Sequence, residues 1–99
     1  MAPSVSVREF VIEDYFRDRV KATGGIVRKV VWPGKRGAPD RMAGWAKTQR
    51  HALVELKRPG GTPEDHQVRE HARLRAIGFD VWVIDTKAGV DIFIDQMTH

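Results

Sequence analysis

The chain has 99 residues, of which 41% are hydrophobic and 30% charged, and it contains no cysteine. A chain of this length builds one modest core, it has no apolar run long enough to span a bilayer, and without cysteine it has no thiolate metal site. Seventeen Lys and Arg against thirteen Asp and Glu give a net charge of +4, so a polyanion is the first partner to consider.

The N-terminus, Met1–Ser4, lacks the basic segment and the apolar stretch of a secretion signal. We therefore expect a cytoplasmic protein. There are no internal repeats, linkers or low-complexity tracts, so residues 1–99 are expected to form a single domain.

The first predicted element is a helix from about Val7 to Lys21. Ser6–Glu9 has the form of a capping box at its start, and Gly24–Gly25 ends it. Glu9 and Glu13 are four residues apart and lie one above the other along the edge of the apolar face. That face is predicted to consist of Val7, Phe10, Val11, Ile12, Tyr15, Phe16 and Val20.

Three strands are predicted next, over residues 26–32, 40–45 and 51–58. The first is rich in β-branched residues and follows the double glycine. The loop between the first two strands contains Lys35 and Arg36 among glycines, so its backbone could approach a phosphate closely. The short connection over residues 46–50 makes the second and third strands antiparallel neighbours.

The third strand carries charges where a buried strand usually has none. Glu55 and Lys57 are two residues apart, so both side chains project from one face, which Leu53 shares. Val54 and Leu56 point to the opposite face, into the expected core. The sheet therefore presents an acid and a base side by side.

A second helix is predicted from the N-cap Thr62 and from Pro63 at its first position to the terminator Gly78. The helix is expected to continue through Gln67, Val68, Ala72, Leu74 and Ile77. A buried strand follows over residues 79–85, and residues 90–97 are predicted to form a short helix.

This order of elements, αβββαβ, indicates an α/β fold with a central mixed sheet flanked by helices. A helical crossover from the third strand to the fourth places those two strands parallel in one sheet.

The acids of the chain suggest a metal site. If Asp40, Glu55 and one acid of the first helix converge, their mutual repulsion requires a cation among them. Oxygen ligands favour Mg²⁺ or Mn²⁺, and the carbonyl of Leu56 is a further candidate ligand. Such an ion would activate water and polarise a phosphodiester, and Lys57 would add electrostatic stabilisation.

These residues carry a resemblance. Pro39–Asp40 followed by Glu55-x-Lys57 resembles the active-site signature of the PD-(D/E)XK nuclease superfamily. The wider pattern resembles the VRR-NUC (virus-type replication-repair nuclease) family, in particular its short stand-alone phage and bacterial members. That pattern comprises Gly24–Gly25, Lys29, Gly34-x-x-Gly37-x-Pro39-Asp40-Arg41, Val54-Glu55-Leu56-Lys57-x-Pro59-Gly60-Gly61 and Gln67.

The resemblance implies a role for each matching residue. Asp40 and Glu55 would be metal ligands, Lys57 the catalytic lysine and Gln67 an active-site residue that orients water or a phosphate. Glu13 matches the acid of the first helix best, with Glu9 second. It also implies Mg²⁺ or Mn²⁺ as cofactor, DNA of a particular structure as substrate, and a homodimer similar to Holliday junction resolvases.

Taken singly, each of these residues has a plainer interpretation: Asp40 as a turn residue, Glu55 and Lys57 as a solvated charge pair, Glu13 as part of a solvated helix edge. The four histidines lack ligand spacing and are expected on the surface or in loops, while the three tryptophans are expected to fill the core or an interface. The cations that flank the site are expected to contact phosphates; they are Lys29, Lys35, Arg36, Arg41 and Arg58.

Two other functions remain open at this point. One is a basic nucleic-acid-binding module without catalysis, and the other is a sequence-specific nuclease of the restriction type. Chelation of metal ions would separate the first from a nuclease, and branched against linear DNA would separate the second from a structure-selective enzyme.

Overall fold

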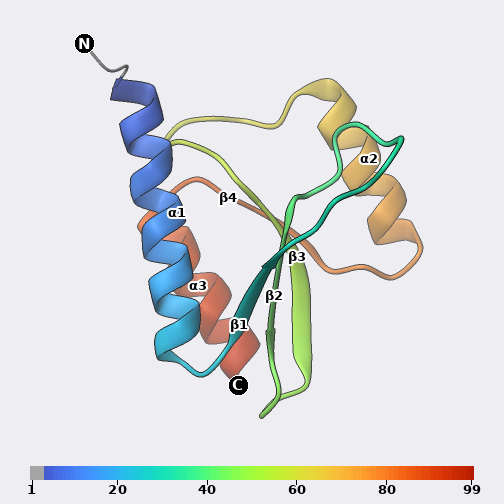
Figure 1. Cartoon of the computed structure of the whole chain (residues 1–99). Helices are drawn as coiled ribbons and strands as arrows, with labels where there is room; N and C mark the ends of the chain where they lie inside the picture. Colours follow the sequence, from blue (N-terminus) through green and yellow to red (C-terminus); the bar gives the residue numbers. More distant parts are fainter. Residues whose placement is uncertain (1–3) are drawn as a thin grey trace.

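The structure is a computed structural model that describes the backbone of residues 4–99 and the side chains of residues 10–99 (Figure 1). Its central feature is a four-stranded sheet with helices on both faces. The elements in chain order are α1 (Ser4–Ala22), β1 (Ile26–Lys29), β2 (Arg41–Trp45), β3 (Arg50–Leu56), α2 (Asp65–Ala76), β4 (Val81–Ile84) and α3 (Lys87–Thr98). No helix in residues 4–99 is both long and apolar enough to cross a membrane.

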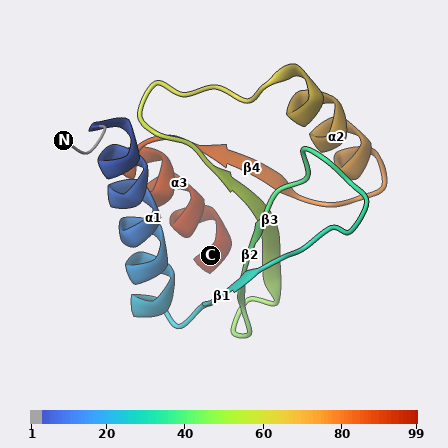
Figure 2. The same ribbon diagram turned by 45° about the horizontal axis from the view of Figure 1, so that its top comes forward.

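The sheet is mixed, as the sequence predicts. Its strand order is β1-β2-β3-β4, in which β1 and β2 pair antiparallel, β2 and β3 pair antiparallel, and β3 and β4 pair parallel. Because α2 forms the crossover between the two parallel strands, it lies on one face of the sheet, while α1 and α3 lie together on the other (Figures 1 and 2). The predicted α/β class and the αβββαβ order are confirmed.

The main core lies between the sheet and the pair α1 and α3. Helix α1 contributes Ile12, Phe16 and Val20, which are four residues apart and so share one stripe. Phe93 of α3 packs against the rings of Phe16, Trp45 and Trp82, at centroid distances of 5.1–5.9 Å. Val54 and Leu56 of β3 belong to this core, as their alternation with Glu55 predicts.

A smaller cluster lies on the α2 face and consists of Leu53, Leu74 and Val81, with Trp32 and other partly buried residues packed against it. The loop between β1 and β2 is fixed here, because the Trp32 indole N–H donates to the carbonyl oxygen of Pro39 over 2.8 Å. The predicted structural role of the tryptophans therefore agrees with their packing.

Helix α1 differs from the sequence prediction at its start and in its stripe. It begins by Ser4, so Ser6 lies inside the helix and is not its N-cap. Phe10 and Val11 are exposed, because α1 faces the sheet with the stripe that begins at Ile12. The Glu9 side chain lies outside the described residues.

Helix α2 starts later than predicted. Its N-cap is Glu64, and neither Thr62 nor Pro63 is part of it. The backbone N–H of Glu64 donates to the Gln67 side chain over 2.9 Å, which fixes the first turn at this point.

The buried face of α2 is not an apolar stripe. It carries Glu70, His71 and Leu74, while Val68 and Ile77 are exposed. The helix has few apolar residues, so the spacing of apolar residues alone did not identify its inner face.

The strands are shorter than predicted at several ends, and the last helix is longer. Helix α3 begins at Lys87, because the Thr86 hydroxyl accepts a hydrogen bond from the backbone N–H of Gly89 (2.9 Å) and so caps it. This helix supplies buried residues at Val90, Phe93, Ile94 and Met97, so it is part of the core and not an appendage.

Candidate active site

The candidate site includes two charged residues at and just after the C-terminal end of β3, Glu55 and Lys57. The side chains of Glu55 and Lys57 project from the α2 face of the sheet and are 13% and 20% exposed. Their charged groups are close, with 3.8 Å between Lys57 Nζ and Glu55 Oε2. Both groups are thus partly removed from water, where electrostatic interactions are stronger than on an open surface.

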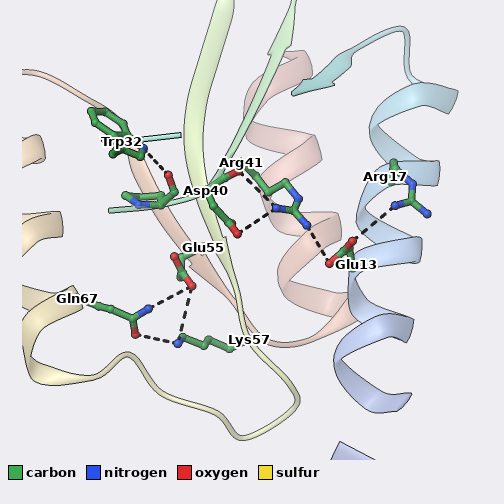
Figure 3. Close-up of polar contacts among 9 residues, drawn as sticks. Glu13, Arg17, Trp32, Asp40, Arg41, Glu55, Lys57 and Gln67 are labelled. Atoms are coloured by element: carbon green, nitrogen blue, oxygen red, sulfur yellow. Dashed lines mark hydrogen bonds and ion pairs between the residues drawn. The ribbon is translucent and has the colours of Figure 1, made fainter. Parts of the chain in front are cut away.

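Gln67, in the first turn of α2, joins these two groups (Figure 3). Its Oε1 accepts hydrogen bonds from Lys57 Nζ (2.8 Å) and from the Glu64 backbone N–H, and its Nε2 donates to Glu55 Oε2 (3.4 Å). Two donors face the oxygen and a carboxylate faces the nitrogen, which determines the orientation of the amide. The helix start therefore holds the acid and the ammonium group in a defined arrangement.

The register of the sheet brings Asp40 to the same place. Arg41 pairs with Val54 across the antiparallel β2 and β3, so the next step of this register sets Asp40 opposite Glu55. The Val30 backbone N–H donates to the Asp40 carbonyl oxygen (3.0 Å), which extends the β1–β2 ladder by the same step. Residues directly opposite on antiparallel strands project from one face with Cβ atoms roughly 5 Å apart. Asp40 and Glu55 are drawn as neighbours at this sheet end in Figure 3.

Arg41, the first residue of β2, joins Asp40 to the first helix (Figure 3). Its guanidinium contacts Asp40 Oδ2 through Nη1 (3.1 Å) and Glu13 Oε2 through Nη2 (3.0 Å). The Arg41 side chain is 11% exposed, and Asp40 is 60% exposed. Glu13 also contacts Arg17 at 3.7 Å. Glu13 is therefore linked to the site through Arg41.

The predicted site residues thus come from four elements and meet near one end of the sheet, in two connected groups. One group is Glu55, Lys57 and Gln67, and the other is Asp40, Arg41 and Glu13 (Figure 3). Leu56, whose carbonyl was a candidate ligand, lies between Glu55 and Lys57 with its side chain buried in the main core.

The other predicted cations are on the surface around these groups. Lys29 is the last residue of β1, and Arg58 follows β3. Lys35 and Arg36 lie in the loop before Pro39, and the side chains of all four are exposed. That loop is held close to α2 at Gly37, whose φ is +86° and where a Cβ would come within 2.9 Å of the His66 ring. A side chain at position 37 would therefore push the basic loop away from α2.

A basic groove of about 430 Å³ between α1 and β1 adds cations that the sequence analysis did not single out. Its lining includes Arg17 and Lys21 of α1 together with Arg28, Lys29 and Arg41, and one acid, Glu13. Residues 10–99, whose side chains the structure describes, contain 16 Lys and Arg and 12 Asp and Glu, so 11 of each remain outside the groove. The net positive charge of this part of the chain is thus found at the groove. The helical spacing of Arg17 and Lys21 and the adjacent pair Arg28–Lys29 could have indicated it.

His71 is buried, although the sequence placed it on the surface or in a loop. It lies one turn after Gln67 on the inner face of α2, is 1% exposed, and its Nε2 has no hydrogen-bond partner among the described residues. Burial lowers the pKa of His71, and the nearby Arg75 and Lys57 cations lower it further, so the imidazole is neutral at pH 7. A neutral ring behind the site adds no positive charge to that of Lys57.

The donor chemistry of the site fits a hard divalent cation. Among the described side chains, no three His, Asp or Glu residues are grouped so as to hold a metal ion by themselves. Mg²⁺ is usually held by only one or two carboxylates, with waters and substrate phosphate oxygens completing its coordination. Asp40 and Glu55, which the register sets opposite each other, offer such a pair of carboxylates.

The chain is similar in sequence and fold to known nucleases. No family model matches the chain. A protein named "Putative nuclease p44", from Acyrthosiphon pisum secondary endosymbiont phage 1, is 43% identical over 81 residues, which are 82% of this chain and 86% of that protein. A solved structure described as a VRR_NUC domain is 35% identical and superposes with a TM-score of 0.79, over 89% of this chain and 95% of the other. With a shared fold, this level of identity and the site described above, the chain belongs to the VRR-NUC nuclease family.

Proposed function

We propose that this nuclease is a structure-selective DNA endonuclease that depends on Mg²⁺ or Mn²⁺ and hydrolyses phosphodiester bonds. Four-way junctions are the proposed substrate, and residues 1–99 act as one nuclease domain in the cytoplasm. The observation that carries this proposal is the register of β2 and β3, whose next step after Arg41–Val54 sets Asp40 opposite Glu55, beside the Lys57–Gln67 contact. The resemblance to stand-alone VRR-NUC proteins supports the choice of junctions and a homodimer.

The residues divide the chemistry among them. Asp40 and Glu55, with the Leu56 carbonyl as a further ligand, would hold the divalent ion, which when bound supplies charge neutralisation at phosphorus and a water of lowered pKa. Lys57 Nζ lies 3.8 Å from Glu55 and can stabilise negative charge that gathers on the phosphate. Gln67 keeps that ammonium group in place and orients water or a phosphate oxygen at the same position.

The homodimer follows from the symmetry of the proposed substrate. A four-way junction has an approximate twofold axis, and two identical subunits related by such an axis present two identical sites to it. Paired nicks on opposite strands are then a consequence of geometry. Light scattering measures the mass of the protein in solution and so tests the homodimer independently of the cleavage activity.

The activity is tested by incubating the protein with a labelled four-way junction, a flap and a linear duplex of the same sequences, each with Mg²⁺ or Mn²⁺. We expect nicking of the junction in preference to the duplex, and loss of all nicking when EDTA is added. Binding without nicking under every condition would instead identify a non-catalytic module. Equal or better cleavage of linear duplexes at one sequence would identify a restriction-type enzyme.

The basic groove between α1 and β1 gives the DNA backbone a path to the site, because Arg41 forms part of its lining and also contacts Asp40. The double variant Lys21→Ala/Arg28→Ala is expected to weaken binding of all DNA sequences about equally. It should also reduce the slope of log affinity against log salt by about two, one for each lost phosphate contact. Fluorescence anisotropy over a series of salt concentrations with Ca²⁺ measures both quantities.

The matched control for this variant is Lys47→Ala/Arg50→Ala, which removes two exposed charges that do not line the groove. We expect a smaller loss of affinity and a smaller change of slope for the control. Equal changes in both variants would show that net charge, and not the groove, determines binding.

A further inference from the structure

The guanidinium of Arg41 lies between two acids of the candidate site. It contacts Glu13 Oε2 at 3.0 Å and Asp40 Oδ2 at 3.1 Å, each through a different nitrogen. Nη1 also donates to the Asp40 backbone carbonyl over 3.4 Å. An arginine held from three directions in this way has little freedom to move toward a phosphate.

The burial of Arg41 supports the same reading. Its side chain is 11% exposed, less than that of either Glu13 (33%) or Asp40 (60%). Arg17 makes a useful contrast, because it also contacts Glu13 but is 53% exposed and has a closer partner in Asp14. Exposed ion pairs such as Arg17–Glu13 contribute little to the stability of the fold. Removing one member of a partly buried network instead leaves the charges of its partners uncompensated.

The position of the guanidinium restricts where metal ions can bind. An ion shared by Glu13 and Asp40 must come within about 2.1 Å of an oxygen of each. The two nitrogens of Arg41 already bridge those two carboxylates. Asp40 lies one register step beyond the Arg41–Val54 pair and so opposite Glu55, which allows an ion to bind between these two carboxylates.

We propose that Arg41 is a positioning residue that serves as a built-in cation, so that each chain takes one divalent ion, on Asp40 and Glu55. Glu13 is held by Arg41 and stays outside the coordination of that ion. This inference rests on the proposed metal-dependent function and specifies its stoichiometry. Under this inference Arg41 positions the acids of the site and does not make the phosphate contact that the sequence suggested. Glu13 acts by holding Arg41.

The test is the number of Mn²⁺ ions bound per chain without DNA, measured by electron paramagnetic resonance of free Mn²⁺ and by calorimetry. The native protein is expected to bind one ion, and Glu13→Gln is expected to bind one with unchanged affinity. Arg41→Ala removes the positive charge between the acids and is expected to bind a second ion. Arg41→Ala/Glu13→Gln should return to one, because the second ion needs Glu13.

Two variants control for charge and folding. Arg41→Lys keeps a cation at the site and is expected to bind one ion, and Arg17→Ala removes the exposed contact to Glu13 and is also expected to bind one. Circular dichroism of Arg41→Lys and Arg41→Ala shows whether each is folded, and if Arg41→Ala is not, Arg41→Gln takes its place.

Two ions in the native protein, or one ion in folded Arg41→Ala or Arg41→Gln, would overturn the inference. In those cases, junction cleavage that still depends on Mn²⁺ would leave the proposed function standing. A native protein that binds no Mn²⁺ and cleaves nothing would contradict both.

Discussion

Lys57→Ala is expected to slow phosphodiester cleavage by at least on the order of 100- to 1,000-fold while leaving DNA affinity nearly unchanged. The Lys57 side chain is 20% exposed and its ammonium group is held by Gln67 Oε1 at 2.8 Å, so that group is positioned before substrate arrives. A preorganised charge of this kind acts mainly on the transition state, and its loss therefore reduces the rate more than the binding. Single-turnover cleavage of a labelled junction measures the rate, and anisotropy with Ca²⁺ measures the affinity.

The matched control is Lys47→Ala, which removes an exposed lysine from the turn between β2 and β3 and should leave the cleavage rate unchanged. Lys57→Arg keeps the positive charge but cannot place it as Nζ does, because the guanidinium is larger and planar. We expect it to recover only a small part of the rate. Cleavage by Lys57→Ala at the native rate would remove Lys57 from the mechanism.

Much of the sheet could be predicted because its strands alternate strictly. Along β3 and the residue after it, Val54 and Leu56 face the main core while Glu55 and Lys57 face α2, and this follows directly from the period of two. The parallel pairing of β3 with β4 follows from the helical crossover. These features depend on local pattern and chain connectivity, which a sequence contains.

Helix α2 could not be placed correctly in the same way, because its inner face is not apolar. His71 is buried there by the docking of the helix against the sheet and the loop at Gly37, a tertiary contact that no local pattern records. The helix start was misplaced for a related reason. Thr62 and Pro63 are good starting residues, yet the Gln67 side chain binds the Glu64 N–H and the helix begins there.

The candidate site was predictable in its members but not in all of its contacts. The sequence places Asp40 and Glu55 on neighbouring antiparallel strands, and the observed register then sets them opposite each other. A shift of one residue in that register would have sent the two carboxylates to different faces. The bridge from Arg41 to Glu13 depends on how α1 docks beside β2, so the sequence could name both residues without pairing them.

Asp40→Asn and Glu55→Gln are each expected to abolish detectable cleavage and to weaken Mn²⁺ binding by more than the 10- to 100-fold that loss of a supporting residue usually costs. A carboxamide keeps the shape of the side chain but lacks the charge that a hard divalent cation requires. The thermal midpoint of Asp40→Asn should not fall strongly, because Asp40 is 60% exposed and lies opposite another acid.

The control for these variants is Asp95→Asn, since Asp95 is 78% exposed on α3 and pairs only with His99 among the described ion pairs. We expect it to cleave and to bind Mn²⁺ as the native protein does. Calorimetric titration and a junction cleavage assay on the same preparations separate loss of metal from loss of fold. If Asp40→Asn and Glu55→Gln both bound Mn²⁺ with native affinity, the ion would have to bind elsewhere, and the opposed pair at the end of β2 and β3 would not be the catalytic centre.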